Sequence, residues 1–381
     1  MTRAVFETMT IADSLKKAEA VAPRPSAKSH AFDVAAGIML ELFPNGNGGG
    51  QCRVRSTNLE VFYDEVIDVI EMEGPATQWR IPTSKFTGII AALPMGTGGR
   101  VEMVQDGEWL NLRSKRTKGR VMRLPAMGYP TWEWFSDETL TTVQELGEKI
   151  LQISWACDDQ MEPYTGVYFD GQYAMGATQK RAGVVPCPIA GLDGPITVPA
   201  KVLGPVIRSA IEAKIGVIGN HLAIAPDPYT RIRCTLYDKP IPSPRGFMGI
   251  AYDSAVEVER KVLSEAIKRM MNITRGSDEI VVIHMMLTGT GMSLRVQGSD
   301  FGESIEEVID VTGTTMHAPV ILRFVPTTLI DAISRVPSER IFVRYNSSGK
   351  DKAVRADSGI AADGTSQYAA WFVQFKEGAQ Q

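Results

Sequence analysis

WRIPTSKFTGIIAAL, at residues 79–93, is a β-rich run that ends in a proline and continues as an apolar pattern with helical spacing. Proline suits the first turn of a helix because the N–H that it lacks would have no partner there. The same arrangement returns as ITVPAKVLGPVIRSAI at residues 196–211 and ILRFVPTTLIDAISRV at residues 321–336. The three prolines, 117 and 127 residues apart, are Pro82, Pro199 and Pro326. This recurrence predicts an internal repeat.

The length of 381 residues fits three copies of this unit. A hydroxyl residue followed three positions later by a carboxylate resembles a capping box, which predicts that a helix opens each third. The candidates are Thr10 with Asp13, Thr142 with Glu145, and Ser254 with Glu257. Runs of β-forming residues, punctuated by glycine-rich turns, fill the rest of each third. We therefore expect an α+β fold of three similar helix-and-sheet domains, at residues 1–135, 136–253 and 254–381.

The composition is that of a globular protein, with 44% apolar and 22% charged residues. No apolar run reaches the length of about 18 residues that a membrane helix needs. The N-terminus lacks the apolar segment of a secretion signal, and the four cysteines are scattered without CxxC spacing. These features favour a cytoplasmic protein with reduced thiols. The formal net charge of -4 argues against a chain that is basic overall, but it does not exclude a basic patch.

The sequence offers little chemistry for catalysis. The glycine-rich segments lack the GK[ST] ending of a phosphate-binding loop, and no GxSxG motif is present. The four histidines are isolated, without the spacing of a metal site. We therefore expect a protein that is not an enzyme and that holds neither a metal nor a cofactor.

Basic residues gather in two places. The segment RSKRTKGRVMR, at residues 113–123, contains six basic residues and no acidic one, and it is predicted to form a basic edge strand. Charge on an edge strand either prevents unwanted pairing or attracts a negative partner. An acidic partner exists within the third domain, in the residues Asp300, Glu303, Glu306 and Glu307. A head-to-tail contact between two copies of the chain would bring these segments together.

The second set of basic residues lies on the polar faces of the expected helices. A solvated helix face is the ordinary explanation for such residues. Collected on one side of a repeated fold, they would instead suit a phosphate backbone bound without sequence preference. The residues are Lys16, Lys17, Lys85, Lys149, Lys201, Arg208, Lys261, Lys268, Arg269 and Arg335.

Residues 54–130 resemble the first domain of the bacterial DNA polymerase III beta sliding clamps. That family has a T-[DN]-L-E strand, a VPARKF-type helix start, and a later strand that ends in Leu-Pro and an aromatic-Pro pair. The matching positions are residues 57–60, residues 81–86, Leu124 with Pro125, and Tyr129 with Pro130. Weaker matches follow in residues 198–201, 178–181 and 306–311, so the resemblance extends over nearly the whole chain.

This resemblance implies a DNA-clamp fold and a closed ring formed by a head-to-tail homodimer. In the family, helices line the hole and sheets form the rim, and the ring holds a DNA polymerase on duplex DNA. The implied partners are duplex DNA bound without sequence preference, a polymerase, a clamp loader, and other proteins with clamp-binding motifs, but no membrane. The implied location is the cytoplasm, at the nucleoid.

The resemblance also implies site residues. The DNA-binding positions are Arg24, Lys85, Tyr164 and Lys201, although Tyr164 also fits a packed loop aromatic. The hydrophobic groove that accepts partner peptides corresponds to Thr178, Arg181, Pro242, Arg245, Phe247, Val354, Val373 and Phe375. The dimer interface corresponds to Lys118, Arg120, Val121, Arg123, Met270, Ile273, Glu303 and Glu307.

The groove departs from the family pattern at two positions. The usual T-[DN]-x-x-R-L element is shortened to residues 178–182 and lacks its leucine, and a polar tail at residues 377–381 replaces the usual C-terminal segment. We therefore expect an altered peptide preference. Two alternatives stay open: a clamp paralogue that competes for partners or confers inhibitor resistance, and an enzyme that acts on a nucleotide in a pocket between domains.

Overall fold

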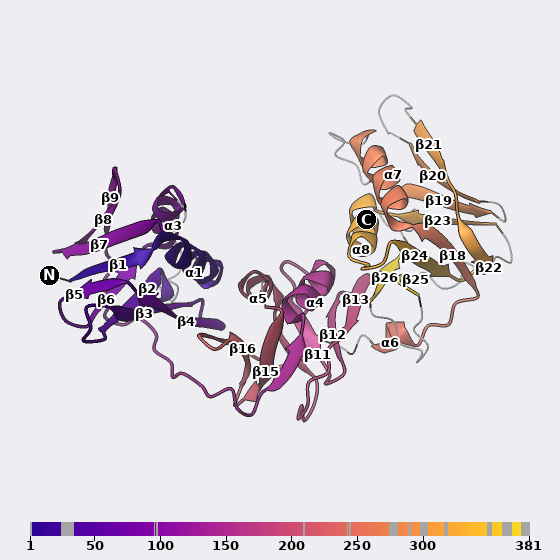
Figure 1. The fold of residues 1–381 in the computed structure, drawn as a ribbon. Coiled ribbons are helices and arrows are strands. Elements are labelled where there is room, and N and C mark those ends of the chain that lie inside the picture. Colours follow the sequence, from indigo (N-terminus) through magenta and orange to yellow (C-terminus); the bar gives the residue numbers. More distant parts are fainter. Residues whose placement is uncertain are drawn as a thin grey trace. The chain divides into compact units, whose positions relative to one another are not determined.

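The computed structural model describes residues 2–23, 34–94, 96, 98–208, 210–241, 243, 245–273, 281–288, 291–297, 304–315, 319–348, 353–359 and 368–374. Figure 1 traces the elements along the sequence. The chain divides into two compact units. The first unit comprises Met1–Glu148, Ile189–Leu192 and Lys201–Leu236, and the second comprises Lys149–Pro188, Asp193–Ala200 and Tyr237–Gln381. The middle third of the sequence thus contributes to both units, and the division into three domains remains a prediction.

The first unit contains two antiparallel sheets. A five-stranded sheet has the order β5 (Glu71–Glu73), β1 (Arg3–Glu7), β7 (Arg100–Asp106), β8 (Trp109–Ser114) and β9 (Thr117–Met122). An eight-stranded sheet has the order β10 (Thr141–Gln144), β15 (Glu212–Ile218), β16 (His221–Asp227), β17 (Thr230–Thr235), β4 (Val61–Val69), β3 (Gly50–Thr57), β2 (Ile38–Pro44) and β6 (Thr77–Ile81). Two helices of this unit are α1 (Thr8–Val21) and α3 (Thr83–Ala91).

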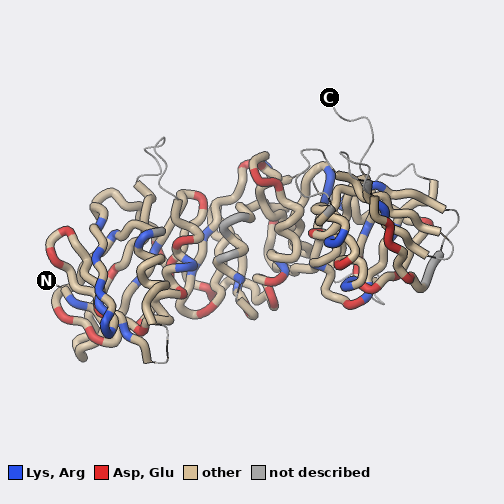
Figure 2. The backbone as a smooth tube through the Cα atoms, turned by 90° about the horizontal axis from the view of Figure 1, so that it is seen from above, with Lys and Arg blue, Asp and Glu red and all other residues tan. Residues whose placement is uncertain are grey.

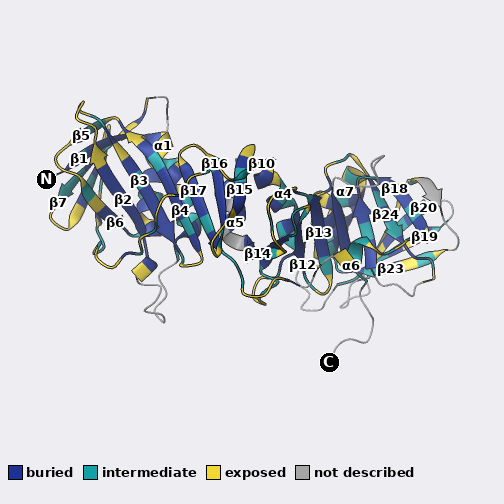
Figure 3. Ribbon diagram, turned by 90° about the horizontal axis from the view of Figure 1, so that it is seen from below, coloured by how far each residue is buried: buried dark blue, intermediate teal, exposed yellow. Residues whose placement is uncertain are grey.

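The eight-stranded sheet has a helix-covered face and an opposite face. Successive side chains of a strand point to opposite sides, and on β4 the odd-numbered residues face α1. Tyr63 is fully buried, and Glu65 pairs with Lys17 of α1. Phe62 and Asp64 lie on the other face, where Phe62 packs edge-to-face against Trp132, with the ring centroids 5.1 Å apart. Buried residues concentrate along these strands (Figure 3).

The second unit also contains two antiparallel sheets. A nine-stranded sheet has the order β14 (Ile196–Pro199), β11 (Gly166–Phe169), β12 (Tyr173–Ala177), β13 (Arg181–Pro186), β26 (Ala369–Val373), β25 (Ala353–Asp357), β24 (Arg340–Tyr345), β18 (Ser254–Glu259) and β22 (Thr312–Thr315). A four-stranded sheet has the order β21 (Ser304–Ile309), β20 (Gly291–Gln297), β19 (Ile283–Thr288) and β23 (Val320–Phe324).

The remaining described helices complete the two units. The second unit contains α6 (Arg245–Met248), α7 (Arg260–Ile273), α8 (Pro326–Ser334) and the short 3-10 helix η1 (Ser154–Ala156). Of the five sequence boundaries between the units, one falls within α4 (Leu146–Ile153) and one at the start of α5 (Ala200–Ile207). The four cysteines are buried free thiols, with Cys52 and Cys234 in the first unit and Cys157 and Cys187 in the second.

The three proline-led helices are present. Pro82 is the N-cap of α3, Pro199 directly precedes α5, and Pro326 is the first residue of α8. A helix lies near the start of each third, as α1, α4 (Leu146–Ile153) and α7 (Arg260–Ile273). The predicted capping boxes are wrong, because Thr142 and Ser254 lie in strands and pair with Lys214 and Tyr345, respectively. Sheet pairing there replaces the local cap, whereas the first candidate hydroxyl lies inside α1, which begins two residues earlier.

Candidate functional site

The helices carry the basic residues that the sequence indicated. Helices α1, α3, α4, α5, α7 and α8 contain nine lysine and arginine residues against five acidic ones, whereas the whole chain has an excess of acidic residues. Figure 2 shows both signs of charge interspersed through each unit. The basic residues on or just after these helices that are exposed are Lys16, Lys85, Arg208, Lys261, Lys268, Arg269 and Arg335. Exposed lysines of this kind are able to meet phosphates without reading bases.

Two of the expected helix cations are instead used within the protein. The Nζ atom of Lys17 lies 2.8 Å from Asp13 and 3.2 Å from Glu65. Burial lowers the pKa of Lys17, but the two carboxylates more than offset this effect, so its pKa is raised. Arg269 makes two hydrogen bonds to Glu307 of β21. Lys17 and Arg269 are therefore already neutralised by neighbouring acids.

The four predicted DNA-binding residues have different surroundings. Lys85 is exposed in the first turn of α3, and Lys201 lies in α5. Tyr164 is half-buried against a cluster of buried apolar residues, and its carbonyl accepts a 2.8 Å hydrogen bond from the N–H of Asp158. This packing agrees with the alternative of a loop aromatic. Arg24 lies outside the described residues.

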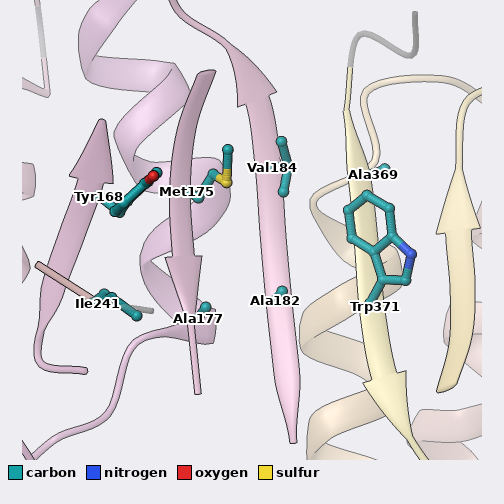
Figure 4. Close-up of a cluster of buried hydrophobic side chains, with 8 residues drawn as sticks. All are labelled: Tyr168, Met175, Ala177, Ala182, Val184, Ile241, Ala369 and Trp371. Atoms are coloured by element: carbon teal, nitrogen blue, oxygen red, sulfur yellow. The ribbon is translucent and has the colours of Figure 1, made fainter. Parts of the chain in front are cut away.

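A cluster of aromatic and apolar residues stands where the peptide groove was expected. Tyr168, Met175, Val184 and Trp371 come from four neighbouring strands of the nine-stranded sheet and share one face (Figure 4). Half-buried side chains pack against the cluster, namely Tyr164, Tyr173, Phe247, Met248 and Tyr252. We call the buried cluster of Figure 4 and these half-buried side chains together the aromatic patch. Phe247 is among the predicted groove residues, whereas Trp371 is not, because the only signal for it in the sequence is a tryptophan in a β-rich run.

Phe247 and Arg245 are the predicted groove residues that meet the aromatic patch. The ring of Phe247, in α6, lies 6.4 Å from that of Trp371. Arg245 forms an ion pair of 2.7 Å with Asp170, and its guanidinium carbon lies 5.7 Å from the ring centre of Tyr173. Burial raises the pKa of Asp170, but hydrogen bonds from Arg245 and two backbone N–H groups more than offset this, so its pKa is lowered. The pair fixes a cation beside the aromatic patch.

The other predicted groove residues have structural surroundings. Thr178 and Arg181 close the turn between β12 and β13, and Arg181 also donates to the carbonyl of Cys157 at 2.8 Å. Val373 is half-buried at the end of β26. Val354 is fully buried in β25, which corrects the expectation that its side chain contacts a peptide. Pro242 and Phe375 lie outside the described residues.

Two edge-to-edge strand pairings join sequence thirds within the units. In the first joint, which we define as the pairing of β4 with β17, residues Val61–Glu65 pair antiparallel with Thr230–Cys234. In the second joint, the pairing of β13 with β26, residues Arg181–Val184 pair antiparallel with Ala369–Phe372. Each joint thus pairs the last strands of two runs of three consecutive antiparallel strands. In the first joint the runs are β2–β3–β4 and β15–β16–β17, and in the second they are β11–β12–β13 and β24–β25–β26.

The last strands of two further runs, β7–β8–β9 and β19–β20–β21, have only one neighbour among the described residues. They are β9, at the edge of the five-stranded sheet, and β21, at the edge of the four-stranded sheet. The predicted basic edge strand, at residues 113–123, is therefore confirmed only for Thr117–Met122, because Arg113 and Ser114 end β8 and Lys115 and Arg116 form the turn between the two strands. On β9, Lys118 and Arg120 are exposed, whereas Val121 is buried and Gly119 faces Ile89 of α3.

The remaining predicted interface residues divide between surface and core. Arg120 lies over the ring of Trp109 at 4.5 Å, and Arg123 donates a hydrogen bond to the carbonyl of Gly107. Met270 is fully buried in α7, which corrects the expectation that its side chain meets a partner. Ile273 ends α7, and Glu303 lies outside the described residues.

Three further observations concern membrane helices, metal sites and matches to family models. None of the helices among the described residues is long and apolar enough to cross a membrane. In the same part of the chain, no three histidine, cysteine or acidic side chains gather as a metal site requires. No family model matches the sequence.

Solved structures share the fold over nearly the full length. The DNA polymerase III beta subunit of Thermotoga maritima superimposes with a TM-score of 0.80 at 16% identity, covering 99% of this chain and 100% of that one. The sliding clamp of Bacillus subtilis has a TM-score of 0.78 at 13% identity, with 98% and 99% covered. A Pseudomonas aeruginosa clamp bound to griselimycin has a TM-score of 0.78 at 16% identity, with 98% and 99% covered. The expected DNA-clamp fold is therefore confirmed.

Proposed function

We propose that this chain is a DNA sliding clamp, a ring that encircles duplex DNA and holds a replicative polymerase on it. The observation that carries the proposal is the repeated joint between last strands, found twice within the chain. Only β9 and β21, among the described last strands, lack such a partner, and they belong to sheets of five and four strands. Joining them between two copies would give a nine-stranded sheet like that of the second joint and would close the ring.

The side chains of the two edges support head-to-tail closure. On β9 the exposed face presents Arg120, and on β21 it presents Glu306. The opposite faces carry Val121 and the half-buried Ile305. An antiparallel register that places Arg120 opposite Glu306 of the partner subunit also places Val121 opposite Ile305 of the partner subunit. Cross-strand pairs of both kinds stabilise sheets.

The charge of the helices supports a role in holding DNA. A ring that slides must attract phosphates without fixing a register, and mobile exposed lysines provide this kind of attraction. We assign this role to Lys85 and the other exposed helix cations, and keep Arg24, Tyr164 and Lys201 as predictions. The location would be the cytoplasm, at the nucleoid.

The aromatic patch supports docking of partner proteins through short apolar peptides. A Pseudomonas aeruginosa protein of this fold has been solved with griselimycin bound. Here half-buried side chains such as Phe247 and Tyr173 provide an apolar surface above the buried cluster that contains Trp371, with the Arg245 cation beside it. The partners would be a polymerase, a clamp loader and other replication or repair proteins.

A topology assay tests the proposal. The full chain is incubated with nicked circular DNA, a bacterial clamp loader and ATP, and protein that stays on the DNA is measured before and after the circle is cut. We expect retention on the circle and loss on linearisation, because a ring slides off a free end. Equal retention on circular and linear DNA would contradict encirclement. Sedimentation provides a loader-independent check, since a monomer at micromolar concentration and low salt would contradict the closed dimer.

A further inference from the structure

The segment at residues 132–137 crosses the first joint on the face of the sheet opposite α1. We call this segment the strap. It is part of the connection between the first and middle thirds of the sequence, and it lies within the first unit. Four arginines of the sheet interact with it, two on β3 and two on β17, on either side of β4. The strap therefore contacts strands from both sequence thirds.

The tryptophan rings of the strap lie against these arginines. The guanidinium carbon of Arg55 is 4.0 Å from the ring centre of Trp132. Trp134 interacts with two guanidinium groups, Arg53 of β3 at 5.5 Å and Arg231 of β17 at 4.9 Å. A cation within about 6 Å of an aromatic ring centre is attracted by the ring quadrupole. The Trp134 ring thus links the two sides of the first joint.

Backbone carbonyls of the strap add directional contacts. Arg233 donates a hydrogen bond of 2.5 Å to the carbonyl of Glu133. Arg231 donates a hydrogen bond of 3.2 Å to the carbonyl of Phe135, whose ring also lies near both arginines, at 5.7 Å from Arg231 and 5.4 Å from Arg233. Charged donors make stronger hydrogen bonds than neutral ones. The strap is therefore held by its backbone as well as by its rings.

The end of the strap is fixed by an acidic residue. Asp137 lies 3.0 Å from Lys214 of β15 and 3.3 Å from Arg231. A hydrogen bond from Lys214 lowers the pKa of Asp137, so this carboxylate is charged at neutral pH. The strap thus extends its contacts to β15, two strands beyond β17 in the sheet.

We propose that the strap is a latch that keeps the first joint closed, with the Trp134 ring as its central element. The two strands of the joint come from segments about 170 residues apart, so no short turn holds them together. The strap supplies that link across the face of the sheet. Without the strap, the joint would depend on its ladder and on side-chain packing such as the contact between Phe62 and His221, and it would open locally more often.

Hydrogen exchange on the full chain tests the latch. Trp134 is 37% exposed, so Trp134→Ala leaves the core intact. We expect the amides of Val61–Glu65 and Thr230–Cys234 to exchange about tenfold faster in this variant, because two cation–π contacts are lost. Trp134→Phe keeps a ring and should restore most of the protection. The matched control is Trp109→Ala, which removes the cation–π contact with Arg120 away from the joint.

Two results would overturn the latch. Exchange within twofold of the parent at the joint amides would mean that the Trp134 ring does not hold the joint. Equal acceleration of all protected amides of the first unit would mean that the ring contributes only to general stability. The test uses the chain without DNA, loader or partner peptide, so its outcome is independent of whether the chain is a clamp.

Discussion

Charge reversal at Arg120 examines the closure of the proposed ring at a single contact. Arg120 is exposed on the free edge of β9, and Glu306 is exposed on the free edge of β21. An opposite-charge pair across two strands contributes about 0.2–1 kcal/mol, and a like-charge pair costs a similar amount. Arg120→Glu replaces the opposite-charge pair by a like-charge pair at both contacts between the subunits of a closed dimer. The expected loss is about 0.8–4 kcal/mol, or about 4- to 900-fold in the dimer Kd.

Sedimentation velocity across a concentration series at about 0.15 M salt measures this Kd. The double variant Arg120→Glu with Glu306→Arg restores opposite charges and should recover most of the affinity. Arg208→Glu makes the same charge change at an exposed site after α5 and serves as the control. It should leave the dimer Kd within about twofold of the parent.

An Arg120→Glu variant that dimerises like the parent would contradict the proposed register, which places this residue directly opposite an acid. A double variant as weak as the single one would also contradict it, because Arg120 would then act through contacts other than Glu306. A dimer whose affinity does not change with salt would likewise contradict an interface of exposed charges.

Three further predictions concern the other surfaces. Trp371→Ala removes a fully packed indole from the aromatic patch and should destabilise the second unit by about 3–5 kcal/mol, seen as a lower urea midpoint by circular dichroism; an unchanged midpoint would show that the indole packing is not needed. Lys85→Ala and Lys261→Ala should each reduce the slope of log Kd against log salt for DNA by about 1, measured by fluorescence anisotropy, and equal slopes would exclude phosphate contacts. The pKa of Asp170 is lowered, so its stabilising pair with Arg245 is fully formed above pH 3.8 and weakens as the pH falls through the pKa of the folded state. Asp170→Asn should remove this part of the acid dependence of stability, measured by urea titration between pH 2 and 5.

The sequence predicted the elements that depend on local patterns. The proline-led helices α3, α5 and α8 follow from a residue that ends a strand and from apolar spacing. The basic edge strand β9 follows from a run of charge that no interior strand would tolerate. Both signals lie within about 15 residues, where backbone chemistry is sufficient to decide the structure.

Long-range pairing set the features that the sequence did not predict. Ser254 begins a strand rather than a helix because Tyr345, far along the chain, lies opposite it in the sheet. Trp371 belongs to the aromatic patch because β26 pairs with β13 of the middle third. The role of Trp134 depends on arginines from β3 and β17, which only the folded sheet brings together. No local pattern contains these partners.

The buried thiols allow the opening of each unit to be followed separately by alkylation. Cys52 and Cys234 belong to the first unit, and Cys157 and Cys187 to the second. Burial raises the pKa of all four, to about 11 for Cys187 and about 12 for Cys157, so the native thiols are protonated at neutral pH and shielded from reagents. Alkylation therefore requires opening of the surrounding sheet. The position of each modified cysteine then identifies which unit opened, and a cysteine introduced on the surface can be labelled selectively beside them.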